Sequence, residues 1–367
     1  MKPSRPSLKR LLSILARFRR RRVLVLGDLM LDHFVRGRVN RLSPEAPVPV
    51  VAVDEETHMP GGAGNVCSNL SALGAAVSVF GVLGDDAAGG QLIRDLQARG
   101  VDTGGVVLDA LRVTTQKCRI VAEHQQVVRF DRETPRVLSA QTQSKLLRKL
   151  SEAMSGADAV VVSDYGKGVV TANAVRKALR AAHRARLPVV VDPKVEHFRR
   201  YKGVDCITPN LQEAWGGMGL HPSQDEAAIH RLGRRILAAL RVRSVLITRA
   251  EKGMTLFAAN DPGPILPSRT RGAEALDTRA PRARARGAGK IVVDHIPTQA
   301  KEVYDVTGAG DTVVSVLSLA LASGARLYEA AVLANLAASI VVGKLGTATI
   351  SADEIKRAVR ESGRRRS

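Results

Sequence analysis

The sequence predicts an α/β fold: a doubly wound, mostly parallel sheet flanked by helices, with a small additional β-sheet near the N-terminus. Three observations favour it. Strands rich in Val, Ile and Leu alternate with helical stretches, as in parallel sheets covered on both faces. The 367 residues are 45% hydrophobic but only 3% aromatic, which indicates an aliphatic core. Several strands also end in polar residues, as expected where a ligand binds at the carboxyl ends of parallel strands.

One large domain, residues 23–358, is expected between two basic appendages. The first, residues 1–22, predicts an amphipathic helix whose leucines recur at helical spacing and would pack on the domain. These leucines are Leu8, Leu11, Leu12 and Leu15. The second appendage is a basic tail, residues 359–367.

The first strand of the domain is predicted at residues 23–28, "VLVLGD". Two short β-prone segments at 33–39 and 47–54 follow, and a helix starts within 61–74. Further strands are expected at "AVSVFGVLG", "DAVVVSDYG", "LPVVVDPK", "DCITPN" and "SVLITRAEKG". Helical stretches separate most of them, which is the order of a parallel sheet.

The strand endings share a polar character. They carry Asp28, Asp164 with Lys167, Asp192 with Lys194, Asn210 with Glu213, and the turn from Asp305 to Asp311. Each alone is more often a cap or turn residue. Because parallel strands bring their carboxyl ends to one edge of the sheet, five such endings together predict a ligand site there.

The formal charge of +21 and the sequence pI of about 10.7 would attract a nucleic acid, an anionic membrane or a phosphorylated metabolite. The excess gathers in residues 17–22, in 279–290 and in the tail, where solvated appendages are the usual explanation. An insertion at about 260–290, rich in Pro, Gly, Ala and Arg, has no apolar period. It is expected to be a surface segment without chemistry.

The three cysteines, Cys67, Cys118 and Cys206, are widely separated and show no paired spacing for zinc or disulfides. The N-terminal apolar run is too short for a signal peptide, and no later segment reaches the length of a membrane span. These features predict a cytoplasmic protein with no membrane partner.

The stretch "EVYDVTGAGDTVVSV", residues 302–316, contains a turn suited to binding an anion. Gly308, Ala309 and Gly310 have almost no side chain, so backbone N–H groups can approach an anion at the positive end of the helix that follows. Asp311 could accept the proton of a hydroxyl that attacks a phosphorus atom. The alternative is that the turn is an ordinary helix start and that Asp311 only caps it.

The motif "DVTGAGDT" resembles the C-terminal signature of the ribokinase-like, or phosphofructokinase B, superfamily of sugar kinases. The resemblance implies that the Gly-Ala-Gly turn is the anion hole, that Asp311 is the catalytic base, and that ATP and Mg²⁺ are required. "GGAGNVCSNLSALG" is similar to the N-terminal counterpart, in which Gly61, Gly62 and Asn65 would hold sugar hydroxyls. The likeness runs from about Val23 to Ala358.

Other positions take roles from the same resemblance. Asn210 and Glu213 would lie by the nucleotide phosphates, with Glu213 reaching the magnesium through water. Asp28 matches a sugar-binding position. The remaining nucleotide-binding candidates are Thr248, Gly253, Thr307 and Asn335, the last of these in the adenine pocket.

One branch fits best, because residues 27–51, "GDLMLDHFVRGRVNRLSPEAPVPVV", are very similar to the opening of the heptose-7-phosphate kinases of lipopolysaccharide precursor synthesis. "SDYGKG" and "VDPK" also resemble that branch. This implies phosphorylation of the anomeric hydroxyl of D-glycero-D-manno-heptose 7-phosphate to the 1,7-bisphosphate. A substrate phosphate needs fixed cations. The candidates on the substrate side are Lys167 and Lys194 first, then Arg38 and Arg41, with Asp192 beside them.

In this family the β-prone segments at about 33–54 form a lid over the sugar, which would exclude water from the transferring phosphoryl group. A homodimer through residues 35–53 is expected, with an ordinary edge hairpin as the alternative. The chain ends soon after the kinase region and has no His-x-Gly-His motif. A separate nucleotidyltransferase is therefore expected to act downstream.

Two other functions remain open at this point. The first is another kinase of the same fold, acting on ribose, fructose 1-phosphate, tagatose 6-phosphate or a nucleoside. The second is an inactive scaffold or nucleic-acid binder that uses the +21 charge. The intact Gly-Ala-Gly-Asp turn favours an enzyme, and no nucleic-acid partner is expected.

Overall fold

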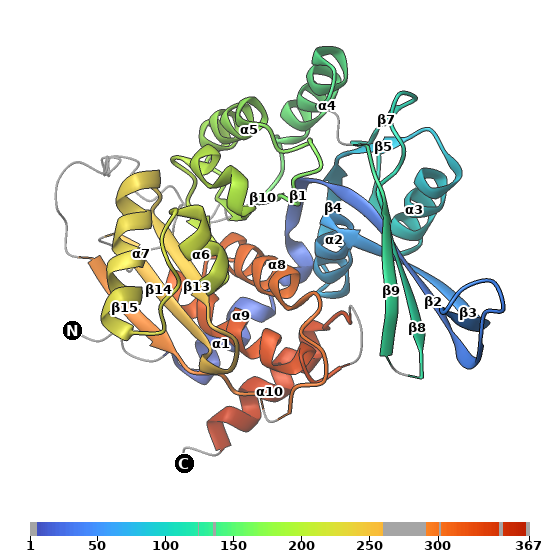
Figure 1. Ribbon diagram of the computed structural model, residues 1–367. Helices are drawn as coiled ribbons and strands as arrows, with labels where there is room; N and C mark the ends of the chain where they lie inside the picture. The colour runs from blue at the N-terminus through green and yellow to red at the C-terminus, as the bar shows by residue number, and fades with distance from the viewer. Residues whose placement is uncertain are drawn as a thin grey trace.

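The computed structural model describes residues 6–123, 125–134, 137–259, 291–300, 302–344 and 348–364. The predicted insertion at 260–290 and the last residues of the tail lie outside these ranges. Within them, a nine-stranded sheet forms the centre of the molecule (Figure 1). Seven strands run parallel, and two antiparallel strands complete one edge. The predicted doubly wound fold is confirmed.

The strands of this sheet, in spatial order, are β15 (Ile291–Ile296), β14 (Met254–Ala259), β13 (Ser244–Thr248), β12 (Cys206–Ile207), β11 (Val189–Asp192), β10 (Ala159–Ser163), β1 (Arg22–Gly27), β4 (Ala76–Phe80) and β6 (Val101–Asp102). The predicted strand "AVSVFGVLG" is divided at Gly81 into β4 and β5 (Val82–Gly84). β5 pairs separately with β7 (Val107–Asp109).

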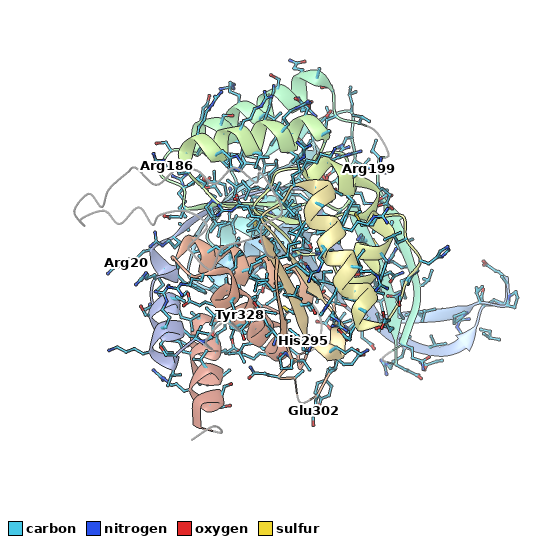
Figure 2. The ribbon with its side chains drawn as sticks, turned by 90° about the vertical axis from the view of Figure 1, so that its left-hand side faces the viewer. Arg20, Arg186, Arg199, His295, Glu302 and Tyr328 are labelled. Carbon is cyan, nitrogen blue, oxygen red and sulfur yellow. The ribbon has the colours of Figure 1, made fainter. Side chains whose placement is uncertain are left out.

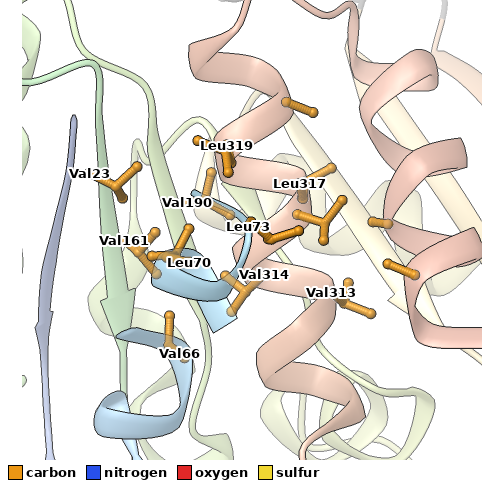
Figure 3. Packing of buried hydrophobic residues seen from close by; sticks show 14 of the residues in the cluster. Val23, Val66, Leu70, Leu73, Val161, Val190, Val313, Val314, Leu317 and Leu319 are labelled. Carbon is orange, nitrogen blue, oxygen red and sulfur yellow. The ribbon is translucent and has the colours of Figure 1, made fainter. Parts of the chain in front are cut away.

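Helices cover both faces of the sheet. One face carries α1 (Leu8–Leu15), α2 (Ala63–Ala72), α3 (Ala87–Ala98), α8 (Ala309–Ala322), α9 (Leu327–Val341) and α10 (Ala352–Arg364). The other carries α4 (Ala140–Ala153), α5 (Ala172–Ala185), α6 (Leu211–Gly217) and α7 (Glu226–Leu240). Because side chains alternate along a strand, β1 sends Val23 to the first layer and Leu24 to the second. Figure 3 shows Val23 with Leu70 of α2 and Val314 of α8 in the first layer.

The N-terminal helix α1 packs on the domain through Leu11, Ile14 and Leu15, which are buried. Arg10 adds an ion pair with Glu329 of α9, at 3.0 Å between Nε and Oε1. Leu8, included in the predicted apolar face, is instead 42% exposed.

A second sheet of four strands, called the lid here, stands beside the main body (Figure 1). Its order is β3 (Pro49–Gly62), β2 (Leu29–Leu42), β8 (Gln116–Ala122) and β9 (Gln125–Arg132). The first two strands are longer than the predicted segments at 33–39 and 47–54. β8 and β9 were not predicted, because every residue of β9 is exposed and its sequence therefore lacks a clear hydrophobic alternation.

Basic residues are spread over the outside of the molecule. Figure 2 shows Arg20, Arg186 and Arg199 on different elements, and each is exposed. None of the helices in the described ranges combines the length and the apolarity needed to cross a bilayer.

Candidate active site

A pocket of about 190 Å³ lies where β2 and β3 meet the start of α8. Five of its lining residues were predicted from the sequence: Gly62, Asn65, Thr307, Gly308 and Asp311. Five others were not: Met30, Asp32, Lys117, Arg119 and Tyr165. The structure thus brings the two glycine-rich motifs together, although they are more than 200 residues apart.

Asp311 lies in the first turn of α8 and is only 5% exposed. Its Oδ2 accepts a hydrogen bond from Asn65 Nδ2 at 2.7 Å, and its Oδ1 accepts one from the Tyr165 hydroxyl at 2.8 Å. Burial raises the pKa of this carboxyl to about 6, although both hydrogen bonds act in the opposite direction. A carboxylate with such a pKa is suited to accepting a proton near neutral pH.

The start of α8 leaves room for an anion. Gly308 precedes the helix in the left-handed region, with φ of 78°, which few residues other than glycine adopt. At Gly310, no described group outside its chain neighbours and the backbone of its own helix lies within 4 Å of the position that a Cβ would occupy. The positive end of a helix beside open space is a natural anion site.

Asp28 does not line this pocket. Its carboxylate accepts hydrogen bonds from the backbone N–H groups of Tyr165, Lys167 and Val169, at 2.9, 3.1 and 3.0 Å. Burial, followed by the charge of Asp164, raises its pKa. Asp28 is therefore placed as the anchor of the loop that carries Tyr165, and the expectation that it binds sugar finds no support in this geometry.

Asp32, which the sequence analysis missed, is the buried carboxylate of β2 that faces the pocket. It is 6% exposed, and its Oδ1 accepts a hydrogen bond from Arg119 Nη1 at 2.6 Å. Its neighbour Gly61 must lack a side chain, because a Cβ there would lie 2.2 Å from Asp32 Oδ2. The signal that could have identified it is the period of two along the strand, which puts Met30 and Asp32 on one face.

The loop after β10 is held by a second buried carboxylate. Asp164 accepts hydrogen bonds from the N–H of Gly166 at 2.9 Å and from the Tyr201 hydroxyl at 2.7 Å. His197 Nδ1 lies 2.8 Å from the same carboxylate. Asp28 and Asp164 together fix the loop, and this fixes the Tyr165 hydroxyl on Asp311.

Asn210 and Glu213 form a capping box at the start of α6. The Glu213 N–H donates to Asn210 Oδ1 at 2.8 Å, and the Asn210 N–H donates to Glu213 Oε2 at 2.8 Å. Burial raises the pKa of Glu213. Burial, and then the charges of Asp311 and Glu213, raise the pKa of Asp192 well above its usual range. Asp192 therefore lies within electrostatic reach of Asp311 and Glu213, and these three carboxylates are called the acidic edge here.

The other predicted nucleotide residues gather elsewhere, around Pro297. Gly253, with φ of 83°, lies so close to this segment that a Cβ would be 2.2 Å from the Ile296 carbonyl oxygen. Asn335 is 2% exposed and donates to the Pro297 carbonyl at 2.8 Å. Thr248 ends β13 and bridges to Asn210, so this group is continuous with the capping box.

None of the predicted substrate cations is among the lining residues of the pocket. Lys167 pairs with Glu133 near the lid, and Lys194 Nζ lies 3.8 Å from Glu196 Oε2. Arg38 pairs with Asp54 across the lid hairpin at 2.9 Å, and Arg41 is exposed. The cations that do line the pocket are Lys117 and Arg119.

The fold and the pocket define a class: a doubly wound α/β protein with a candidate anion site next to a buried carboxylate of raised pKa. A family model described as pfkB family carbohydrate kinase matches residues 20–279 and 285–354. The chain therefore belongs to the pfkB family of carbohydrate kinases, which confirms the resemblance in its two glycine-rich motifs.

Curated relatives share the name "Bifunctional protein HldE". The protein of Trichlorobacter lovleyi is 43% identical over 336 residues, covering 92% of this chain and 62% of the relative. That of Geobacter metallireducens is 42% identical over 343 residues, covering 94% and 64%. The chain thus spans less than two thirds of the length of these relatives.

Solved structures share the fold. Phosphofructokinase-2 from Escherichia coli, in complex with potassium, has a TM-score of 0.71 at 18% identity, covering 94% of this chain and 99% of that one. Arabidopsis thaliana ribokinase, complexed with ribose and ATP, has a TM-score of 0.66 at 18% identity, covering 93% and 98%.

Proposed function

We propose that this chain is an ATP-dependent kinase that phosphorylates the anomeric hydroxyl of D-glycero-D-manno-heptose 7-phosphate, giving the 1,7-bisphosphate used in ADP-heptose and lipopolysaccharide precursor synthesis. The observation that carries the proposal is Asp311, held between Asn65 and Tyr165 at the start of α8. The heptose substrate is supported by residues 27–51, which resemble heptose-7-phosphate kinases, and by relatives that share the name HldE.

In the proposed reaction, the ionised Asp311 takes the proton of the sugar hydroxyl. The sugar oxygen forms a bond to the γ-phosphorus of ATP while the bond from that phosphorus to the bridging oxygen of ADP breaks. Backbone N–H groups at the start of α8 stabilise the charge on the migrating group. Asn65 and Asp32 orient the sugar beside the base.

ATP would extend from the start of α8 past Lys194 and Glu213 towards Thr248, Gly253 and Asn335. Within the described residues, no group of three or more His, Cys, Asp or Glu side chains is arranged to hold a bare metal ion. The partly buried Glu213, in the acidic edge with Asp192, fits Mg²⁺ bound through water instead. The ion would neutralise phosphate charge.

The deciding assay is mass-spectrometric detection of a heptose bisphosphate from heptose 7-phosphate and Mg-ATP. Asp311→Asn is the matched control, because it keeps the size of the side chain and removes the base. Turnover of ribose or another sugar in place of heptose 7-phosphate would reject the heptose assignment. Continued turnover by Asp311→Asn would reject the role of the base.

The family resemblance also supports a homodimer formed through the lid. Within the expected segment, residues 35–53, Val48 and Val53 are 51% and 52% exposed. The lid face turned away from the pocket adds Val128 and Phe130 on β9, each 46% exposed. Exposed apolar groups of this size on a sheet are suited to covering by a second subunit.

A further inference from the structure

We propose that Lys117 and Arg119, on lid strand β8, form the binding subsite for a second anionic group of the substrate. That group is a phosphate ester at the end of the sugar opposite the hydroxyl that reacts. The inference rests on the proposed function, because it identifies the residues that would recognise the phosphate of a sugar phosphate in the same pocket.

The strand geometry turns both cations towards the pocket. Side chains alternate along β8, so Lys117 and Arg119 share the face that lines the pocket, while Cys118 between them lies on the other face with its Sγ 3.6 Å from His33 Nδ1. Lys117 is paired in register with Asp32 of β2.

A second row of the same face adds further positive charge. Arg119 is paired in register with Phe34 of β2 and with Arg129 of β9. Its guanidinium lies 5.1 Å from the centre of the Phe34 ring. The face of the lid that covers the pocket is therefore basic and structurally fixed.

Of the two cations that line the pocket, Arg119 has an ion-pair partner among the described residues and Lys117 does not. Arg119 is hydrogen-bonded to Asp32, Arg129 pairs with Asp131, and Lys167 pairs with Glu133. Within the described part of the chain, Lys117 Nζ forms no ion pair, and it lies 5.5 Å from the centre of the Tyr165 ring.

The surroundings of Lys117 disfavour its charge. Burial lowers its pKa, and the charges of Lys167, Arg119 and Arg129 lower it further, against the opposing effect of Asp32. A half-buried ammonium with three other cations nearby is unfavourable unless anions offset their repulsion. A phosphate dianion between Lys117 and Arg119 would relieve this repulsion and form charge-assisted hydrogen bonds.

The position of Lys117 indicates which anion it binds. The Tyr165 hydroxyl contacts Asp311, and Lys117 lies against the ring of the same tyrosine. Lys117 comes from lid strand β8 and Asp311 from the start of α8, so the two groups approach the pocket from different elements. The migrating phosphoryl group belongs at the start of α8, so an anion at Lys117 is carried by the remote end of the sugar.

The test uses steady-state kinetics with saturating Mg-ATP and two substrates, heptose 7-phosphate and the same heptose without its phosphate. The variants are Lys117→Met and, as the conservative replacement, Lys117→Arg. Arg132→Met is the matched control, because Arg132 is an exposed cation of the lid that is paired in register with Gln116, on the same face as Cys118. Circular dichroism and thermal unfolding establish that each variant is folded.

We expect Lys117→Met to raise KM for heptose 7-phosphate roughly 10- to 100-fold, the usual effect of losing a hydrogen bond to a charged group. At pH 8, where Asp311 with its pKa of about 6 stays ionised even without the nearby charge of Lys117, kcat, and kcat/KM for the unphosphorylated heptose, should stay within about twofold. Lys117→Arg should restore most of the affinity, and Arg132→Met should behave as wild type. An equal loss with both heptoses, or a fall in kcat alone, would overturn the subsite and place Lys117 at the reacting end.

The same experiment separates this inference from the proposed function. If the wild-type protein phosphorylates neither heptose but phosphorylates fructose 1-phosphate or tagatose 6-phosphate, the heptose assignment is rejected. The proposed subsite is then supported if Lys117→Met raises KM for that sugar phosphate, and it is rejected if KM is unchanged. If wild type accepts only sugars without a phosphate, both are overturned.

Discussion

At the scale of single residues, the pKa of Asp311 sets the pH dependence of the proposed reaction. A base acts only when ionised, and burial puts this pKa at about 6. We expect kcat/KM to fall about tenfold per pH unit below pH 6 and to be level above it. The Tyr165 hydroxyl favours the ionised form of Asp311. Tyr165→Phe should therefore raise the pH below which kcat/KM falls, the acid limb of the profile, by roughly 0.5–1 pH unit.

The measurement is the pH profile of kcat/KM for wild type and Tyr165→Phe between pH 5 and 9. Tyr304→Phe is a suitable control, since that hydroxyl is bonded to Glu302 at 2.7 Å and the residue is 64% exposed. Its acid limb should coincide with that of wild type. An acid limb unmoved by Tyr165→Phe would mean that the tyrosine only fills space.

Asp311 should also reduce stability at neutral pH. Its pKa is raised in the folded chain, so its favourable contribution is complete below the unfolded pKa of about 3.9 and is lost as the pH rises through 6. Asp311→Asn should therefore be inactive yet more stable than wild type at pH 7.5, by up to about 3 kcal/mol. The two proteins should differ little at pH 4. Thermal or urea unfolding at both pH values measures this, and equal stability at pH 7.5 would contradict it.

The sequence predicted those site residues that lie in short local motifs. Asn65, Thr307, Gly308 and Asp311 come from glycine-rich segments whose backbone shape is locally determined. Tyr165 could not be predicted, because it reaches Asp311 only through the anchoring of its loop. Asp28, the residue chosen as a sugar ligand, is part of that anchoring.

At the scale of elements, the end of β3 depends on the close approach of Gly61 to Asp32. A methyl group at Gly61 would lie 2.2 Å from Asp32 Oδ2 and would displace that carboxylate. We expect Gly61→Ala to raise KM for the sugar roughly tenfold or more, the usual effect of losing a hydrogen bond to a charged group, while KM for ATP changes little. Initial-rate kinetics with each substrate varied in turn would show this.

Gly90→Ala is the control for that substitution. Gly90 lies within α3, where the nearest group to an added Cβ is the flexible end of Arg94 at 3.4 Å. Alanine should stabilise that helix by roughly 0.5–1 kcal/mol without altering either KM. If Gly61→Ala also left both KM values unchanged, Asp32 would not be a sugar ligand.

Secondary-structure elements differ in how clearly the sequence pattern predicts them. Strands such as β10 are buried along their whole length, so an unbroken apolar run predicts them. β8 and β9 mix cations with isolated apolar residues, because one face of the pair lies over a polar pocket and every residue of β9 is exposed. Lys117 and Arg119 were missed for this reason, since their approach to the site depends on pairing with β2 across more than 80 residues.

At the scale of the whole molecule, the lid is the proposed interface of a homodimer. Its pocket face is basic, while its other face carries Val128 and Phe130, each nearly half exposed on β9. If two lids pack through these faces, a charge introduced there should prevent dimer formation. Burying an ionised carboxylate in an apolar interface costs several kcal/mol. We expect Phe130→Glu to convert a dimer into a monomer at micromolar concentration.

Sedimentation velocity of wild type and Phe130→Glu over a hundredfold range of concentration measures this directly. Val137→Glu is the matched control, because Val137 is 79% exposed and lies beyond the lid strands. It should leave the dimer intact. A wild-type monomer throughout the range, or a Phe130→Glu dimer as tight as wild type, would exclude this face of the lid as the interface.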